Sequence, residues 1–283
     1  NCCGGIALLL SVMKAAKVRY TPYSIRRALA NSAKRIETAD VFAQGPGLLQ
    51  VDSALEYLLK NQRAIGEQLR FNVRVSRRGG SRGIYLRKSH EISQPSVNSV
   101  SVKAMFPERT SGRTKTAFEM RIALVATESW VRVGSHFLLT AGGSQFTVSV
   151  DPTKLKPGAH FAEVHGIDAL HPERGPIFRV PVTVISPTPL SEKTPFVHRT
   201  TLEFKTAEIH RQFFVVPKGA EWANLTLRAR TPDSQPRRFI LHTLENHSGQ
   251  SIDKIAERSF ISLNHGHLHS KSFAVRGGHV VEI

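Results

Sequence analysis

Residues 69–75, LRFNVRV, mark the point at which the pattern of this chain changes and so decide its fold class. Apolar side chains alternate there with Arg70, Asn72 and Arg74, which predicts a half-buried β-strand, because successive side chains of a strand point to opposite faces. Before residue 62 the apolar residues recur at helical spacing instead. The sequence therefore predicts a helical N-terminal piece followed by mainly β structure.

The first helix is expected over residues 6–13, which are apolar on nearly all sides. This pattern predicts a buried helix rather than an amphipathic surface helix. A native N-terminus is usually polar and poorly ordered unless something ties it down. The chain also stops at residues 280–283 within an apparent strand. We therefore expect both ends to be cut ends of a longer protein.

A second, amphipathic helix is predicted from Thr21 as N-cap and Pro22 at the first helical position. Its apolar stripe would bury Ile25 and Ala28, with Arg26 and Arg27 pointing outward. Residues 48–51 are expected to form a short strand. Asp52 would then cap a last helix that buries Ala54, Leu55, Leu58 and Leu59.

Short strands separated by turn signals are expected from residue 62 onward, a spacing typical of a β-sandwich. Residues 186–189, Ser-Pro-Thr-Pro, interrupt this pattern and predict a linker. More strands are expected after it, at 201–204, 212–216, 222–228 and 238–244. The predicted domains are residues 1–61, 62–186 and 187–283, the last of them incomplete.

Composition points to a globular protein: the 283 residues are 40% hydrophobic, and no apolar run approaches the ~20 residues that span a bilayer. Cys2 and Cys3 are the only cysteines, and adjacent cysteines do not easily bridge each other. The absence of a disulfide framework favours a reducing, cytoplasmic location.

The formal charge of +17 raises nucleic acid as a partner. The basic residues are nevertheless spread through the chain, and aromatic residues, at 7%, do not interleave with the densest cluster as stacking platforms would. This cluster is expected on the solvent face of a hairpin and comprises Arg70, Arg74, Arg77, Arg78, Arg82, Arg87 and Lys88. A solvated surface or an acidic neighbouring subunit is favoured over nucleic-acid binding.

Two motifs that would carry chemistry are missing from the sequence, which has no HExxH and no CxxC. Cys2 and Cys3 lead an apolar helix and are interpreted as packing residues rather than nucleophiles. Alternate residues on a strand share a face, so three imidazoles could meet one metal, but an exposed polar face is favoured for His265, His267 and His269.

The sequence does not predict a pair of carboxylates that could act as general acid and general base. Asp40, Asp52 and Glu56 are instead expected to flank turns or cap helices. Taken alone, the chain is predicted to hold no catalytic, cofactor-binding or metal-binding residue, and no cofactor.

Residues 1–61 nevertheless resemble the C-terminal end of a subtilisin-like serine peptidase domain. In that family the nucleophile precedes a buried helix of small and aliphatic residues, and closing motifs follow it in a fixed order. The matching stretches are residues 1–11 (NCCGGIALLLS), 25–33 (IRRALANSA) and 42–54 (FAQGPGLLQVDSA).

The continuation is similar to the tripeptidyl-peptidase II family, in which the peptidase domain is followed by an immunoglobulin-like domain and a galactose-binding-like jelly roll. The stretches that carry this likeness are residues 69–75, 82–87 (RGIYLR), 129–131 (SWV), 150–158 (VDPTKLKPG), 175–184 (GPIFRVPVTV), 211–217 (RQFFVVP) and 219–223 (GAEWA).

The resemblance implies a fragment of a cytosolic serine exopeptidase that removes tripeptides from free N-termini and assembles into a large homo-oligomer. The family's catalytic residues would fall upstream of Asn1, so Ser11, His90 and His136 are not triad candidates and the fragment alone should be inactive. The alternative is a non-catalytic β-sandwich scaffold or a carbohydrate-binding module. It is disfavoured by the lack of a cluster of exposed Trp or Tyr, Trp222 being expected in the core.

Overall fold

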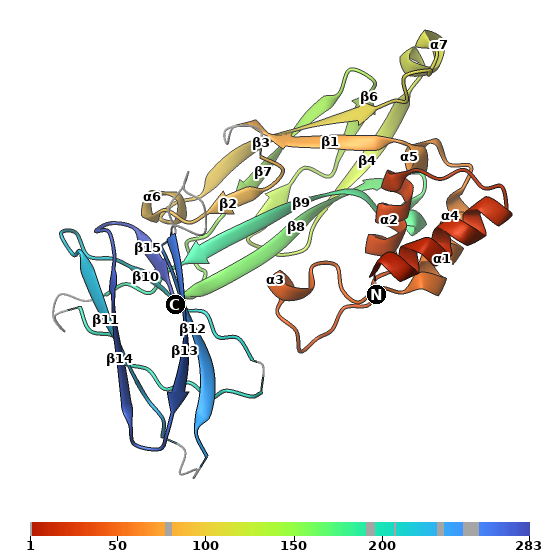
Figure 1. Cartoon of the computed structure of the whole chain (residues 1–283). Coiled ribbons are helices and arrows are strands. Elements are labelled where there is room, and N and C mark those ends of the chain that lie inside the picture. Colours follow the sequence, from red (N-terminus) through yellow and green to blue (C-terminus); the bar gives the residue numbers. More distant parts are fainter. Residues whose placement is uncertain (1, 77–80, 191–195, 207, 231–234, 246–254) are drawn as a thin grey trace. The chain divides into compact units, whose positions relative to one another are not determined.

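The computed structural model describes residues 2–76, 81–190, 196–206, 208–230, 235–245 and 255–283 (Figure 1). The chain divides into two compact units, Asn1–Ile84 with Ser96–Val150 and Phe161–Val182, and Tyr85–Pro95 with Asp151–His160 and Thr183–Ile283. Helices precede the strands along the chain, as the change of periodicity predicted. They are α1 (Cys2–Ala15), α2 (Pro22–Ser32), α3 (Val41–Gln44), α4 (Val51–Asn61), α5 (Ile65–Gln68), α6 (Ser89–Ile92) and α7 (Gly112–Thr116).

Helices α1, α2 and α4 enclose one apolar cluster, made of Leu9, Met13, Ile25, Ala28, Ala54 and Leu58. Gly5 lets α1 come close to the start of α4, because a Cβ there would lie 2.9 Å from side-chain atoms of both Leu49 and Val51. Among the described residues, no helix has the length and hydropathy needed to cross a membrane.

The predicted start of α2 is confirmed in atomic detail. The Thr21 hydroxyl accepts a hydrogen bond from the Ser24 amide at 3.0 Å, and Pro22 occupies the first helical position. The predicted strand at residues 48–51 is wrong, since Leu48 forms only an isolated bridge with Lys34 and Val51 already begins α4. Asp52 does not cap α4 either, because it lies inside the first turn and Gln50 takes the N-cap position.

The middle of the chain contains two sheets in its described part: an antiparallel four-stranded sheet of order β1-β3-β7-β5 and a five-stranded sheet of order β2-β9-β8-β4-β6. Their side chains alternate between buried and exposed along each strand, as in β3, where Val100, Val102 and Ala104 are buried. The strands are β1 (Arg70–Val75), β2 (Ile84–Leu86), β3 (Ser96–Met105), β4 (Glu119–Ala126), β5 (Val131–Val133), β6 (His136–Thr140), β7 (Ser144–Val150), β8 (Gly158–Asp168) and β9 (Pro176–Ser186).

The C-terminal strands form a four-stranded sheet of order β10-β15-β12-β13 and the pair β11-β14, counted over the described residues. Thr188, in the predicted linker, forms a bridge with Phe214 at the start of these sheets. The strands are β10 (Phe213–Val215), β11 (Trp222–Arg228), β12 (Arg237–Glu245), β13 (Ala256–Leu263), β14 (Leu268–Ala274) and β15 (Val280–Glu282).

Two predictions for this region are wrong. Residues 201–204 form no strand. Trp222 is 67% exposed rather than part of the core, because Ala223, Leu225 and Leu227 take the inward face of β11 and leave Trp222 on the other face. The domain boundaries at 61/62 and 186/187 stay a prediction.

Candidate functional site

A buried arginine fixes helix α2 to the start of the sandwich. Arg27 is only 7% exposed, and its guanidinium donates to the carbonyl oxygens of Gly66 at 2.9 Å and Leu69 at 3.0 Å. Its Cζ atom also lies 5.5 Å from the centre of the Phe71 ring. The prediction that Arg27 points outward is wrong, because α5 and the residue that follows it present carbonyl groups with which a guanidinium can form hydrogen bonds.

Asn31 extends this contact by one turn of α2, on the same helix face. Its amide nitrogen donates to the carbonyl oxygens of Arg174 at 2.8 Å and Pro176 at 3.2 Å, and its amide oxygen accepts from Arg179 Nη2 at 2.7 Å. Gly175, between the two carbonyl groups, has a φ of 69°, a conformation that favours glycine. The loop that enters β9 is therefore held by a single side chain of α2.

Charged side chains of β8 and β9 complete what we call the α2 junction: Arg27, Asn31, Glu163, His165 and Arg179. One oxygen of Glu163, Oε2, lies 2.8 Å from His165 Nε2 and 3.7 Å from Arg179 Nε. Burial raises the pKa of Glu163, but the hydrogen bond and charge of His165 and the charge of Arg179 outweigh it and lower the pKa overall. Burial also lowers the pKa of Arg179.

The α2 junction has the chemistry of an anchor and not of a reaction centre. Its five members include no hydroxyl or thiol nucleophile. The hydrogen bonds and ion pairs named above link side chains of α2, β8 and β9 to one another or to carbonyl groups of α5 and of the chain at the start of β1 and β9. Partly buried, charge-assisted contacts of this kind fix orientation. The junction can thus hold α2, and the helices packed on it, at a defined place on the sandwich.

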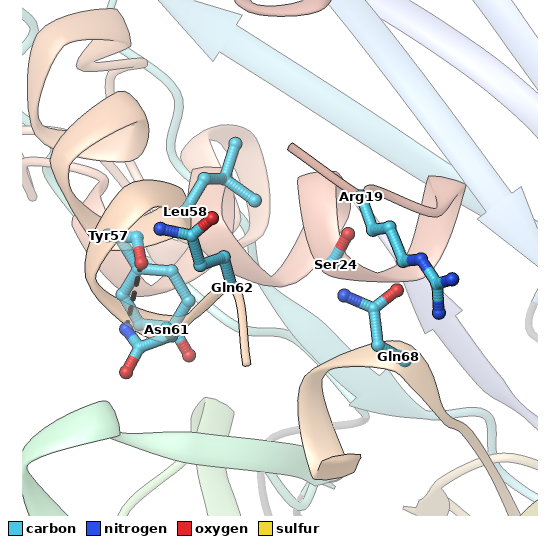
Figure 2. Close-up of a pocket in the computed structure, with 7 residues that line it drawn as sticks. All are labelled: Arg19, Ser24, Tyr57, Leu58, Asn61, Gln62 and Gln68. Atoms are coloured by element: carbon cyan, nitrogen blue, oxygen red, sulfur yellow. Dashed lines mark hydrogen bonds between the residues drawn. The ribbon is translucent and has the colours of Figure 1, made fainter. Parts of the chain in front are cut away.

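A hollow beside the junction is too small to take a ligand. Figure 2 shows Arg19, Ser24 and Gln68 facing Tyr57, Leu58, Asn61 and Gln62 across it. Its volume is about 190 Å³ including open solvent, below the roughly 300 Å³ at which small-molecule sites begin. Asn61 uses its amide to bond the Tyr57 carbonyl at 2.8 Å, so it is already engaged within α4.

The two cysteines are exposed at the start of α1, so neither is packed against the described residues of this chain. Gly5, Leu9 and Met13 form the buried face of this helix. Cys3 lies away from that face, whereas Cys2 lies on it, at the first residue of the helix. Ser11 donates to the Ala7 carbonyl at 2.9 Å within the same helix. As predicted for a capping carboxylate, Asp40 accepts from the Phe42 amide at 2.9 Å.

The three histidines near residue 267 do not share one strand face. His265 and His267 lie in the connection between β13 and β14, and only His269 belongs to β14. Within the described ranges, no group of three or more His, Cys, Asp or Glu side chains could hold a metal ion. His90 and His136 are exposed, on α6 and β6.

The basic cluster is largely solvated where the structure describes it. Arg74, Arg82 and Lys88 are exposed. Arg70 and Arg87 lie over the rings of Tyr23 and Tyr85, at 5.6 and 5.1 Å. Arg77 and Arg78 lie outside the described residues.

Comparison with known proteins gives a consistent result over the whole chain. A model of the first Ig-like domain of tripeptidyl-peptidase II matches residues 69–185, and one of its galactose-binding domain-like region matches residues 204–283. Tripeptidyl-peptidase 2 of Arabidopsis thaliana is 40% identical over 251 residues, which is 87% of this chain and 18% of that protein. The Drosophila melanogaster protein of the same name is 32% identical over 99% of this chain and 20% of its own length.

A crystal structure of tripeptidyl peptidase 2 superposes with a TM-score of 0.91 at 31% identity, covering 99% of this chain and 24% of that chain. The match includes the N-terminal helices and both β regions. The chain spans about a fifth of the length of the curated relatives that it matches.

Proposed function

Because this chain belongs to the tripeptidyl-peptidase II family, we propose that it forms part of a peptidase that releases tripeptides from the free N-termini of peptides. The observation that carries the proposal is the superposition over 99% of the chain at a TM-score of 0.91, which includes the helices as well as the β domains. The alternative of a non-catalytic scaffold or binding module is not favoured, since the similar proteins named above are tripeptidyl-peptidases.

The proposed chemistry is that of a subtilisin-like serine peptidase. A serine attacks the scissile carbonyl and forms an acyl-enzyme, a histidine acts as base, and an aspartate orients the histidine. This chain supplies none of these groups in our proposal. Its helix α1 corresponds to the helix that follows the nucleophile in the family, so the chain's task is to fix that helix.

The exposed side of α1 supports this assignment. Leu8 is 63% and Val12 40% exposed, whereas Leu9 and Met13 on the adjacent face are buried. Burying the exposed apolar side chains of α1 would be favourable by roughly 25 cal/mol for each Å² of apolar surface removed from water. The remainder of a peptidase domain would provide that cover.

The α2 junction would connect this helix to the sandwich. Leu9 and Met13 of α1 share one apolar cluster with Ile25 and Ala28 of α2, while Arg27 and Asn31 hold α2 to the chain that enters β1 and β9. Small displacements of catalytic groups cost large factors in rate. We therefore propose that the immunoglobulin-like domain positions the nucleophile through α2 and α1.

For the whole protein we propose a cytoplasmic location, peptide substrates and a large homo-oligomer. Supporting observations are the two cysteines, both exposed thiols, and the family resemblance. Neither nucleic acid nor a membrane is among the proposed partners.

A chimera tests the proposal. The chain replaces the matching segment of the Arabidopsis thaliana tripeptidyl-peptidase 2, and hydrolysis of a tripeptide aminocoumarin amide is measured with a free and with an acetylated N-terminus. We expect hydrolysis of the free substrate only, inhibition by a serine-directed sulfonyl fluoride, and no activity from the chain by itself. A correctly folded chimera without activity, or an active isolated chain, would refute the proposal.

A further inference from the structure

Strands β12 and β13 carry an exposed apolar pair on their outer face. Ile240 and Phe260 are direct cross-strand neighbours, and they are 61% and 72% exposed. The inner faces of the same strands bury Leu241, Ile261 and Leu263. Directly opposed residues of an antiparallel pair have Cβ atoms about 5 Å apart. The two side chains therefore form one continuous apolar spot on the surface.

Arginines lie at both ends of this spot. Arg238 faces the same side two residues before Ile240, and Arg258 lies with its Cζ atom 5.0 Å from the centre of the Phe260 ring. Arg258 is paired in register with His242, so the two arginines are separated by four residues along β12. At about 3.4 Å per residue, this separation along the strand is roughly 14 Å.

Neither arginine is neutralised within the part of the chain that the structure describes. None of the ion pairs there includes Arg238 or Arg258. Glu257, the nearest carboxylate along β13, lies on the opposite face and contacts Lys271 Nζ at 3.2 Å. The face thus presents positive charge on both sides of an apolar centre.

We propose that this face, the β12–β13 patch (Arg238, Ile240, Arg258 and Phe260), binds a protein segment that carries carboxylates on both sides of an apolar side chain. Charge complementarity selects such a partner, because the two guanidinium groups would pair with carboxylates while the apolar spot excludes water. A second copy of this chain is a poor match, since it carries a net charge of +17. This inference is independent of the peptidase chemistry.

The spacing defines a probe. In an extended peptide, residues two apart share a face, so carboxylates four residues apart stand about as far from each other as the two arginines. A fluorescein-labelled peptide with the central sequence Glu-Ser-Leu-Ser-Glu, flanked by Gly and Ser, meets this requirement. The same peptide with Lys in place of both Glu residues is the control ligand. Binding to the full 283-residue chain is measured by fluorescence anisotropy.

Two variants remove the two components of the patch: Phe260→Ser, and the double variant Arg238→Glu with Arg258→Glu. The matched control is Arg228→Glu with Leu268→Ser, because Arg228 and the 66% exposed Leu268 are also cross-strand neighbours on an outer face, but on the β11-β14 pair. All these side chains are exposed, so the substitutions leave the fold intact, and far-UV circular dichroism checks this.

The proposal predicts that the Glu peptide binds at least tenfold more tightly than the Lys peptide. Each patch variant should weaken binding about tenfold, as expected for anchor residues, and the control variant should leave it unchanged. Equal binding of both peptides, or no effect of the patch variants, would overturn it. So would heparin or RNA binding the patch as tightly as the peptide, or self-association of the chain that Phe260→Ser abolishes.

Discussion

Helices α1 and α2 contribute to the same apolar cluster, but their burial departs from their sequence patterns in opposite ways: α1 is less buried than its pattern predicts, and α2 buries a residue predicted to be exposed. Helix α1 is apolar on nearly all sides, but it buries only Gly5, Leu9 and Met13. Helix α2 is amphipathic with two adjacent arginines, and one of these, Arg27, is buried more deeply than the Leu8 of α1. Apolar side chains of α1 are thus exposed to solvent, while the charged guanidinium of Arg27 in α2 is buried.

The difference between the two helices shows which surfaces are covered by residues of this chain and which are not. Arg27 and Asn31 find their carbonyl partners within the chain, so their burial is complete without any other molecule. The outer side of α1 finds no such cover among the described residues, since Leu8 stays 63% exposed. In our account, α2 is a finished internal contact and α1 is the surface that the rest of a peptidase domain covers.

The largest effect is expected from Arg27→Ala. This change leaves the carbonyl groups of Gly66 and Leu69 without their donors, at a cost of about 1 to 3 kcal/mol for each buried group. We expect the opening free energy of α2, measured by hydrogen exchange of its amides, to fall by about 3 kcal/mol. Arg26, the exposed neighbour of Arg27, serves as the control. Arg26→Ala should change the opening free energy of α2 by less than about 0.5 kcal/mol. Equal effects of the two substitutions would contradict the burial of Arg27.

A pair of glycine substitutions tests the two sides of α1. A Cβ at Gly5 would meet Leu49 and Val51 at 2.9 Å, whereas nothing lies within 4 Å of one at Gly4. Gly5→Ala should therefore destabilise the helical cluster by about 1 to 3 kcal/mol through overpacking. Gly4→Ala should stabilise it by up to about 1 kcal/mol through helix propensity. Thermal unfolding followed by circular dichroism measures both, and a shift of the same sign for both would show that α1 does not pack as described.

The smallest effect concerns pH. The pKa of Glu163 is lowered from its ordinary value of 4.5. The carboxylate therefore contributes to the free energy of unfolding above pH 4.5, and this contribution is lost as the pH falls through the folded-state pKa. Glu163→Gln should therefore cost about 1 kcal/mol at pH 7 and progressively less below pH 4.5. Urea denaturation of both proteins across pH 3 to 7 measures the difference, with exposed Glu56→Gln as control. A cost that does not change with pH would show that the carboxylate charge contributes nothing.

Local patterns predicted most of the fold. The N-cap of α2, the alternation in β1 and the helical spacing of α4 are set by neighbouring residues, and each was predicted within a few residues. The strands β6, β13 and β14 were not predicted, because polar residues interrupt their alternation: in β13, Ser259 and Glu257 share the face of Ile261. Trp222 was assigned to the core by residue type, although the parity of Ala223, Leu225 and Leu227 already placed it on the outer face.

The α2 junction could not be predicted in the same way. Arg27 is satisfied by carbonyl groups 39 and 42 residues away, and Asn31 by groups 143 and 145 residues away. A backbone carbonyl has no residue type, so no sequence motif marks such partners. The weak signal available was the position of Arg27 and Asn31 one helical turn apart, beside the apolar stripe of Ile25 and Ala28.

The most direct test of the central claim is Leu8→Asp, made both in the isolated chain and in the chimera with the Arabidopsis thaliana protein. Leu8 is 63% exposed here, so the isolated chain should keep its melting temperature within about 2 °C. In the chimera, the same change would bury an unpaired carboxylate on the helix that follows the nucleophile, and hydrolysis of the tripeptide substrate should fall at least tenfold. A Leu8→Asp chimera with full activity would show that the outer side of α1 faces solvent in the peptidase, and our account of this helix would be wrong.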